Sequence, residues 1–139
     1  MNFFVDNNLP PALARALHEL SAHEQPAYGT VQVVPLRAKF DVATPDSQWM
    51  AELAKERGWF VISLDRFKKG NLEREALRAS GLTVYRLEHA WTQHRFWDQS
   101  HNLVRWWPVV LQHAFRVTSA AVWKVPWKFG GNSKIELLA

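Results

Sequence analysis

Short apolar runs alternate with more polar stretches along the first ninety residues of the chain. The runs at 2–6, 30–36, 59–64 and 82–86 are rich in β-branched and aromatic residues, which predicts four buried strands. Helical spacing of apolar residues predicts helices over 9–20 and 45–57, and a shorter helix is expected over 72–79. Alternating strands and helices of this length indicate a parallel sheet between helices, and so an α/β fold.

The helix predicted over 45–57 carries signals at both of its ends. Thr44 is a good N-cap residue, and Pro45 suits the first helical position, where its missing N–H costs nothing. Gly58 is expected to end the helix. Asp46 lies one turn before the apolar stripe that begins at Trp49, so its side chain is expected to point toward the sheet.

The last third of the chain has a different pattern. Residues 91–115 are predicted to be mostly helical, and Pro108 should kink this helix or split it in two. Residues 121–127 and 134–138 should be extended, with Gly130-Gly131-Asn132 forming a hairpin turn between them. We expect one domain over 1–139, made of an α/β core at 1–90 and a tryptophan-rich extension at 91–139.

Composition and charge narrow the function classes. The 139 residues include no cysteine, which excludes disulfides, cysteine nucleophiles and cysteine-based metal sites and fits a reducing cytoplasm. We see no membrane span and no signal peptide. Lys and Arg number five against eight acids in residues 1–65, but twelve against five in 66–139. An acidic first half and a basic second half suit a metal centre beside a surface that binds a polyanion, although both could be ordinary solvated surface.

Two of the predicted strands end on an aspartate. Asp6 follows the first strand and Asp65 follows the third, and the carboxyl ends of strands are where open α/β sheets bind ligands. Asp46 begins a helix that packs on the same sheet, so the topology brings three carboxylates together. Their mutual repulsion favours a hard divalent cation, and oxygen ligands of this kind suit Mg²⁺ or Mn²⁺. Such an ion can activate a water molecule against a phosphodiester.

Each of these residues also has a simpler interpretation. Asp6 could form an Asx turn, and Asp46 could be favoured in a first helical turn by the helix dipole alone. Three basic residues follow Asp65, namely Arg66, Lys68 and Lys69. Their side chains would contact phosphates, or they could lie in an ordinary solvated loop. The aromatic residues that alternate with basic residues in the extension could stack on the nucleobases of RNA. Trp107, however, falls on the apolar stripe of the last helix, which favours a core position.

Three segments together resemble a known family. They are Asp6-Asn7-Asn8-Leu9-Pro10, Thr44-Pro45-Asp46 opening a helix, and Val61 to Phe67 around Asp65. This combination is similar to that of the PIN-like nuclease domains, most of all the VapC-type toxins of bacterial toxin–antitoxin pairs. The match is clearest over residues 1–90, and Trp106-Trp107-Pro108 is also similar.

The resemblance implies a three-layer α/β/α sandwich and a metal-dependent endoribonuclease that hydrolyses RNA phosphodiesters. It places Asp6, Asp46 and Asp65 as catalytic metal ligands for Mg²⁺ or Mn²⁺, with Asn8 and Ser63 as hydrogen-bonding neighbours. It further implies the toxin of a type II pair, with RNA as substrate and a cognate antitoxin as protein partner. A fourth acid found in larger PIN domains has no counterpart here, because bases follow Asp65.

Alternatives remain open at the level of sequence. The missing fourth acid favours a non-catalytic PIN-like module that binds RNA or a protein partner. A receiver-like phosphoacceptor domain also places acids at strand ends, but it needs an acidic pair at the first strand, where this chain has asparagines after Asp6. It also needs a late lysine where Arg86 stands. The tryptophan-rich extension could pack on the sheet edge, form a homodimer surface or receive an inhibitor.

Overall fold

Strands and helices alternate along the computed structural model, which describes residues 1–65 and 76–138. The strands are β1 (Asn2–Val5), β2 (Gln32–Pro35), β3 (Trp59–Ser63), β4 (Thr83–Leu87), β5 (Val122–Val125) and β6 (Glu136–Leu137). The helices are α1 (Pro11–Ser21), α2 (Gln25–Tyr28), α3 (Leu36–Lys39), α4 (Asp46–Glu56) and α6 (Phe96–Arg116), with short 3-10 turns η1 (Ala22–Glu24) and η2 (His89–Gln93). Residues 76–80 are also helical. The four strands expected in the first ninety residues are confirmed, with ends that differ by one or two residues.

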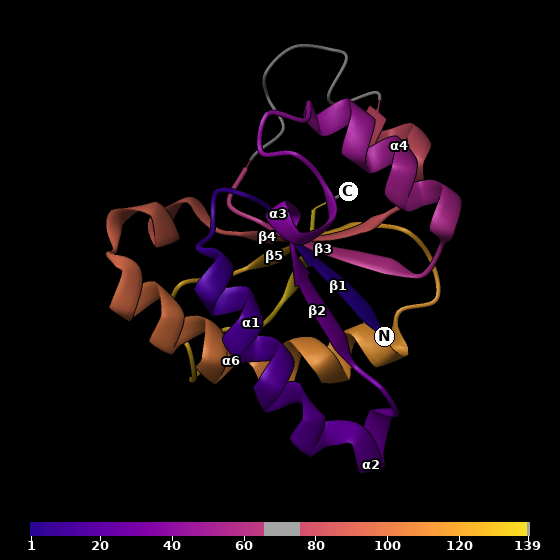
Figure 1. Ribbon diagram of the computed structural model, residues 1–139. Coiled ribbons are helices and arrows are strands. Elements are labelled where there is room, and N and C mark those ends of the chain that lie inside the picture. The colour runs from indigo at the N-terminus through magenta and orange to yellow at the C-terminus, as the bar shows by residue number, and fades with distance from the viewer. Residues whose placement is uncertain (66–75, 139) are drawn as a thin grey trace.

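All six strands belong to one sheet, in the order β2-β1-β3-β4-β5-β6. The first five are parallel to their neighbours, and only β6 runs antiparallel, against β5. The tryptophan-rich extension therefore continues the sheet of the first ninety residues, since β5 pairs directly with β4 (Figure 1). The carboxyl ends of β1 and β3 lie side by side near the middle of this sheet.

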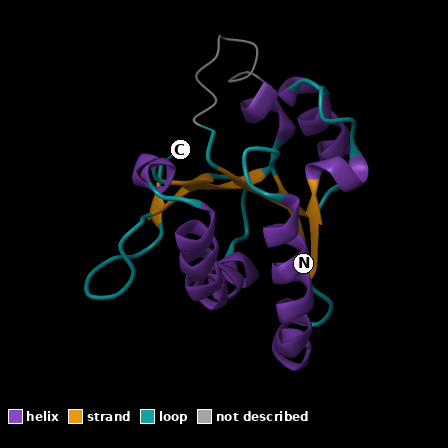
Figure 2. Cartoon of the chain, turned by 60° about the vertical axis from the view of Figure 1, so that its left-hand side comes forward, coloured by secondary structure: helices purple, strands orange, loops and turns teal. Residues whose placement is uncertain are grey.

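Helices cover both faces of the sheet, as Figure 2 shows with the strands seen nearly edge-on. Alternate residues of each strand point to opposite faces, so β1 contributes to two separate cores. Phe3 and Val5 pack with α1 and α6, whereas Phe4 packs with α3 and α4. Strands that are apolar on both faces are typical of parallel sheets between helices. The α/β/α arrangement expected from the sequence is confirmed.

The start of α4 differs from the prediction. The helix begins at Asp46, and Pro45 rather than Thr44 is its N-cap residue, with an extended backbone (φ −59°, ψ 146°). No side chain caps this end; instead the Pro45 carbonyl accepts from the N–H of Gln48 at 3.0 Å. The prediction of a Thr44 cap was wrong because Pro45 lies one position outside the helix. Gly58 does follow its end, in the left-handed region at φ 75°.

Pro108 does not split α6. The helix is continuous from Phe96 to Arg116 with Pro108 inside it, so of the two expected outcomes, a kink or a split, the split does not occur. Proline removes one N–H and leaves the carbonyl four residues earlier without its usual partner. Pro108 is exposed and Val104 is partly exposed, so water can satisfy that carbonyl, while the opposite face keeps its buried stripe.

The end of the chain forms the expected hairpin. β5 and β6 pair antiparallel, with Lys124 opposite Glu136, and the turn between them contains Gly130 at φ 93° and Gly131 at φ 59°. Most L-residues avoid such angles, which explains the two glycines. In residues 1–65 and 76–138, no helix has both the length and the apolar character needed to cross a bilayer.

Candidate functional site

The strand register places Asp6 beside Ser63. Val5 pairs with Ile62 in the parallel β1–β3 ladder, and the N–H of Asp6 donates to the carbonyl of Ile62 at 3.0 Å. The next residue on each strand is therefore Asp6 on one and Ser63 on the other. Their side chains share one face because residues at the same level of adjacent strands point the same way.

Asp6 is buried, at 5% exposure, and both of its carboxylate oxygens accept hydrogen bonds. Oδ1 accepts from the N–H of Asn7 at 2.6 Å, and Oδ2 accepts from the Ser63 hydroxyl at 2.8 Å. The Ser63 oxygen in turn accepts from the N–H of Asp65 at 2.9 Å. One hydroxyl thus links the carboxylate that ends β1 to the backbone at Asp65.

Asn8 holds the ends of β1 and β3 together from the other side. Its Oδ1 accepts from the N–H of Leu64 at 3.2 Å, and its Nδ2 donates to the Ser63 hydroxyl at 3.4 Å. The two polar neighbours singled out from the sequence, Asn8 and Ser63, therefore belong to one hydrogen-bond network with Asp6. This network fixes the rotamer of the Asp6 side chain.

Asp46 is tied to the start of its own helix. Its Oδ1 accepts from the indole N–H of Trp49 at 2.9 Å, and Trp49 is fully buried. The contact pulls the carboxylate toward the core side of α4, as the sequence predicted from their spacing of three residues. Asp46 is half-buried and not fully solvated.

The electrostatics of Asp6 link the three aspartates. Burial raises the pKa of Asp6 from 3.8 to about 6, although the hydrogen bonds from Ser63 and Asn7 act in the opposite direction. The negative charges of Asp46 and Asp65 raise the pKa of Asp6 further. Both charges that act on Asp6 within the described residues are therefore negative. Carboxylates in this situation gain from a nearby cation.

Carboxylate oxygens are ligands of the kind that a hard divalent cation prefers. Across residues 1–65 and 76–138, no three His, Cys, Asp or Glu side chains are grouped closely enough to hold a metal ion together. Asp6, Asp46 and Asp65 thus interact through charge without forming a closed set of ligands. Mg²⁺ keeps several of its waters in proteins, so a carboxylate can also hold it through a bound water.

A positively charged side chain that the sequence analysis missed, that of Arg37, lies at the edge of this site. The Arg37 Nε donates to Asn7 Oδ1 at 3.0 Å, which brings an exposed guanidinium next to the residue after Asp6. Arg37 and Arg15 also line a cavity of about 490 Å³ between the start of α1 and α3. The available signal was a base two residues after a strand end, and the four-residue helix α3 that positions it is too short to show a pattern. Of the predicted bases, Arg66, Lys68 and Lys69 lie outside the described residues.

Four tryptophans of the extension, Trp91, Trp97, Trp106 and Trp107, divide into core and surface. Trp91, Trp106 and Trp107 are buried, so the core interpretation is confirmed for them. Trp97 is 79% exposed and packs edge-on against Phe96 at 5.0 Å between ring centroids. Within the described extension, Trp97 is thus the aromatic side chain of this group that a base could reach.

Comparison with known proteins gives one match. A family described as a PIN-like domain matches residues 1–89, which is more than half of the chain. The matched segment contains all three aspartates, Asn8 and Ser63. No curated protein and no solved structure matches the chain.

Proposed function

The chain belongs to the PIN-like domain family, and from that premise we propose that it is a metal-dependent endoribonuclease. It hydrolyses RNA phosphodiesters at the carboxyl edge of the sheet, where β1 and β3 end. Asp6, Asp46 and Asp65 are its catalytic carboxylates. Asn8 and Ser63 orient Asp6 through the hydrogen bonds described above.

The state of Asp6 is the observation that carries this proposal. A carboxylate that is 5% exposed, flanked by two further negative charges and raised in pKa to about 6 costs folding free energy at neutral pH. Such costly arrangements cluster at functional sites. The fixed rotamer supplied by Ser63 and Asn7 makes the carboxylate a preorganised ligand.

Asp6, Asp46 and Asp65 would hold Mg²⁺ or Mn²⁺ directly or through its waters. The bound ion would supply a water of lowered pKa and stabilise charge on the phosphodiester. The protein keeps Asp6 ionised for this role, since hydrogen bonds to the charged form oppose the effect of burial on its pKa. Ser63 connects the Asp6 carboxylate to the backbone N–H of Asp65 and so ties the ends of β1 and β3 together.

The substrate class follows from charge. Residues 66–139 carry a net charge of +7, against −3 for residues 1–65. Arg37 donates to the side chain of Asn7, the residue after Asp6, and we assign Arg66, Lys68 and Lys69 to phosphate binding after Asp65. A polyanion that approaches the acidic centre needs such flanking cations to offset repulsion.

We place the enzyme in a bacterial type II toxin–antitoxin pair, in the cytoplasm, with a VapC-like role. The resemblance over Asp6 to Pro10 and around Asp65 supports this assignment. A cognate antitoxin would then be a small protein encoded beside it, and the chain could also form a homodimer. Induced expression should arrest bacterial growth, and expression of the neighbouring reading frame should restore it. Growth that continues at full rate with soluble protein present would rule out the toxin role.

The direct test is RNA cleavage with Mn²⁺ or Mg²⁺ by wild type, Asp6→Asn and Asp65→Asn. Each substitution should lower the cleavage rate about 100-fold, because metal-ion stabilisation of the transition state is worth several kcal/mol. Glu52→Gln is the matched control, since Glu52 is an exposed acid on α4 that pairs with Lys55. Full activity of both aspartate variants would overturn the proposal.

One observation favours a second candidate, a non-catalytic module that binds RNA or protein. The aspartates do not form a closed set of three ligands among the residues that the structure describes. RNA binding that EDTA leaves unchanged, with no cleavage of any substrate, would support this candidate. Cleavage that EDTA abolishes would exclude it.

A further inference from the structure

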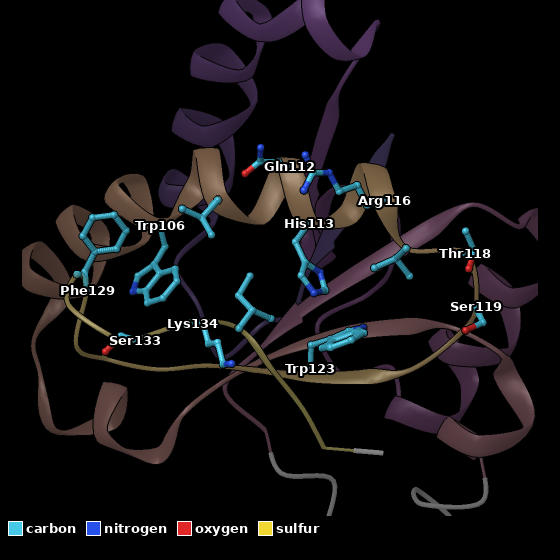
Figure 3. A pocket seen from close by; sticks show the side chains of 14 residues that line it. Trp106, Gln112, His113, Arg116, Thr118, Ser119, Trp123, Phe129, Ser133 and Lys134 are labelled. Carbon is cyan, nitrogen blue, oxygen red and sulfur yellow. The ribbon is translucent and has the colours of Figure 1, made fainter.

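A second cavity lies far along the chain from the aspartates. Its volume is about 560 Å³, within the range of small-molecule sites. α6 forms one wall, and β5 with the segment 129–135 forms the other (Figure 3). The lining residues all lie between 106 and 135. They are therefore outside the segment 1–89 that matches the family.

The cavity has flat aromatic walls. Trp106 comes from α6, Trp123 from β5 and Phe129 from the segment after it. Trp106 and Phe129 meet edge-on at 5.0 Å between ring centroids, while Trp123 meets His113 edge-on at 4.4 Å. In Figure 3, His113 points from α6 toward Trp123, and Trp106 lies at the other end beside Phe129. Walls of this kind favour a planar ring.

Two indole N–H groups at this cavity lack acceptors. Trp106 Nε1 and Trp123 Nε1 are buried without a hydrogen-bond partner among the described residues. Other tryptophans do have acceptors, since Trp91 Nε1 donates to the Val125 carbonyl at 3.0 Å and Trp107 Nε1 donates to the Ser21 hydroxyl at 2.8 Å. A buried donor without an acceptor costs about 1–3 kcal/mol. Both of these costs fall at one cavity.

The polar groups of the cavity favour a negatively charged ligand. Arg116 and Lys134 line it, and none of its described lining residues is acidic. His113 also lines the cavity, and its Nδ1 lies 2.8 Å from the Tyr85 hydroxyl. If Tyr85 donates in this bond, its proton is satisfied and the imidazole proton stays on Nε2. Burial lowers the pKa of His113, so the ring is neutral at pH 7 and the positive charge comes from Arg116 and Lys134.

We propose that this cavity binds a small planar aromatic anion. The ring lies between Trp123 on one side and the packed pair of Trp106 and Phe129 on the other, and the anionic group lies near Arg116 and Lys134. Acceptor atoms of the ligand pair with the two indole N–H groups after a small rotation of each ring, which is needed because neither nitrogen is exposed to water. The chemistry is shared by aromatic carboxylates and nucleoside monophosphates.

Calorimetric titration of the full chain with three anionic probes tests the proposal and distinguishes an aromatic carboxylate from a nucleoside monophosphate as the ligand. The probes are 2-naphthoate, uridine monophosphate and adenosine monophosphate, and 2-naphthamide is the uncharged comparison. We expect at least one anion to bind with a micromolar to millimolar Kd and the amide to bind more weakly. Binding by naphthoate alone identifies an aromatic acid, and binding by the nucleotides alone identifies a nucleotide. Absence of binding by all three anions up to millimolar concentration overturns the proposal.

Variants locate the binding. Lys134→Gln should weaken the anion about threefold to tenfold, because one charge-assisted contact is lost. Trp123→Phe keeps an aromatic ring at this position and removes the indole N–H, and it should also weaken binding about threefold to tenfold. Lys128→Gln is the control, since Lys128 is exposed just before the segment 129–135 but does not line the cavity. Equal affinity in wild type and both cavity variants, or an equal loss in Lys128→Gln, would overturn the proposal.

Discussion

At the scale of single residues, Asp6 shows how the site is set up at the expense of stability. Its pKa is raised to about 6 in the folded chain from 3.8, so the folded state holds the proton more tightly than the unfolded state does. Protonated Asp6 therefore favours folding below pH 4, and the advantage is lost as pH rises through 6. Above that pH the ionised group costs about 3 kcal/mol, at 1.36 kcal/mol for each pKa unit.

Asp6→Asn should accordingly stabilise the chain at pH 7.5 in EDTA, by up to about 3 kcal/mol, because it removes a buried charge. The gain should shrink toward zero at pH 4. Urea unfolding at both pH values measures it. Asp41→Asn is the control, since Asp41 is exposed and the amide keeps the Oδ1 that accepts from Ala43 N–H at 2.8 Å. A destabilised Asp6→Asn at pH 7.5 would refute this account of the site.

Ser63 lowers the pKa of Asp6 through its hydroxyl, so Ser63→Ala should raise that pKa further. Metal binding requires the ionised carboxylate, and the pH at which Mn²⁺ raises the thermal midpoint should therefore move upward in this variant. Thermal unfolding with and without Mn²⁺ across pH 5–8 shows the shift. An unchanged pH profile would mean that Ser63 does not tune Asp6.

At the scale of elements, most helices and strands could be predicted from the spacing of apolar residues, which repeats every two residues in a strand and every 3.6 in a helix. The runs at 59–64 and 82–86 became β3 and β4 because strands that are buried on both faces are rich in apolar and β-branched residues. The end of α4 shortly before Gly58 and the glycine turn before β6 were also predictable, because glycine adopts positive φ angles that other residues avoid. The Thr44 cap was wrong, and of the two outcomes expected at Pro108 the split did not occur, because both depend on what water and neighbouring carbonyls can satisfy.

Helices α1 and α6 are joined by a contact that no local pattern reveals. The Trp107 Nε1 donates to the Ser21 hydroxyl, and the two residues are 86 positions apart in sequence. Trp107→Phe should cost about 1–3 kcal/mol of unfolding free energy, because it removes this buried hydrogen bond and some packing. Trp97→Phe, at an exposed position, should stay within about 0.5 kcal/mol of wild type. Equal effects of the two changes in guanidinium unfolding would argue against a structural role for the contact.

Arg37 became visible as part of the site only in three dimensions. Its sequence neighbourhood resembles any strand end, whereas the structure places its Nε against Asn7. Arg37→Ala should weaken binding of a single-stranded RNA in EDTA and lower the salt slope of binding by about 1. Lys55→Ala, at a base near the far end of α4, should leave the slope unchanged. Fluorescence anisotropy at several salt concentrations compares them, and identical slopes would exclude Arg37 from the RNA surface.

At the scale of the whole molecule, the topology of the sheet brings residues that are far apart in sequence to one edge. Parallel strands β1 and β3 bring Asp6 and Ser63 to one edge. The parallel strand β2 ends at the same edge, where α3 follows it directly, and α4 begins with Asp46 a few residues later. Alternation of strands and helices made this convergence predictable. The absence of a closed set of three ligands among the described residues was not predictable, because it depends on side-chain positions of a few ångströms.

The central claim is that Asp6, Asp46 and Asp65 jointly hold one divalent cation, and a calorimetric titration with Mn²⁺ at pH 7.5 tests it most directly. Wild type and Glu52→Gln should bind Mn²⁺ alike. Asp6→Asn, Asp46→Asn and Asp65→Asn should each weaken the binding about tenfold or more, because each removes one charge from the ligand set. Mn²⁺ affinities that are equal in wild type and in the three aspartate variants would contradict the claim.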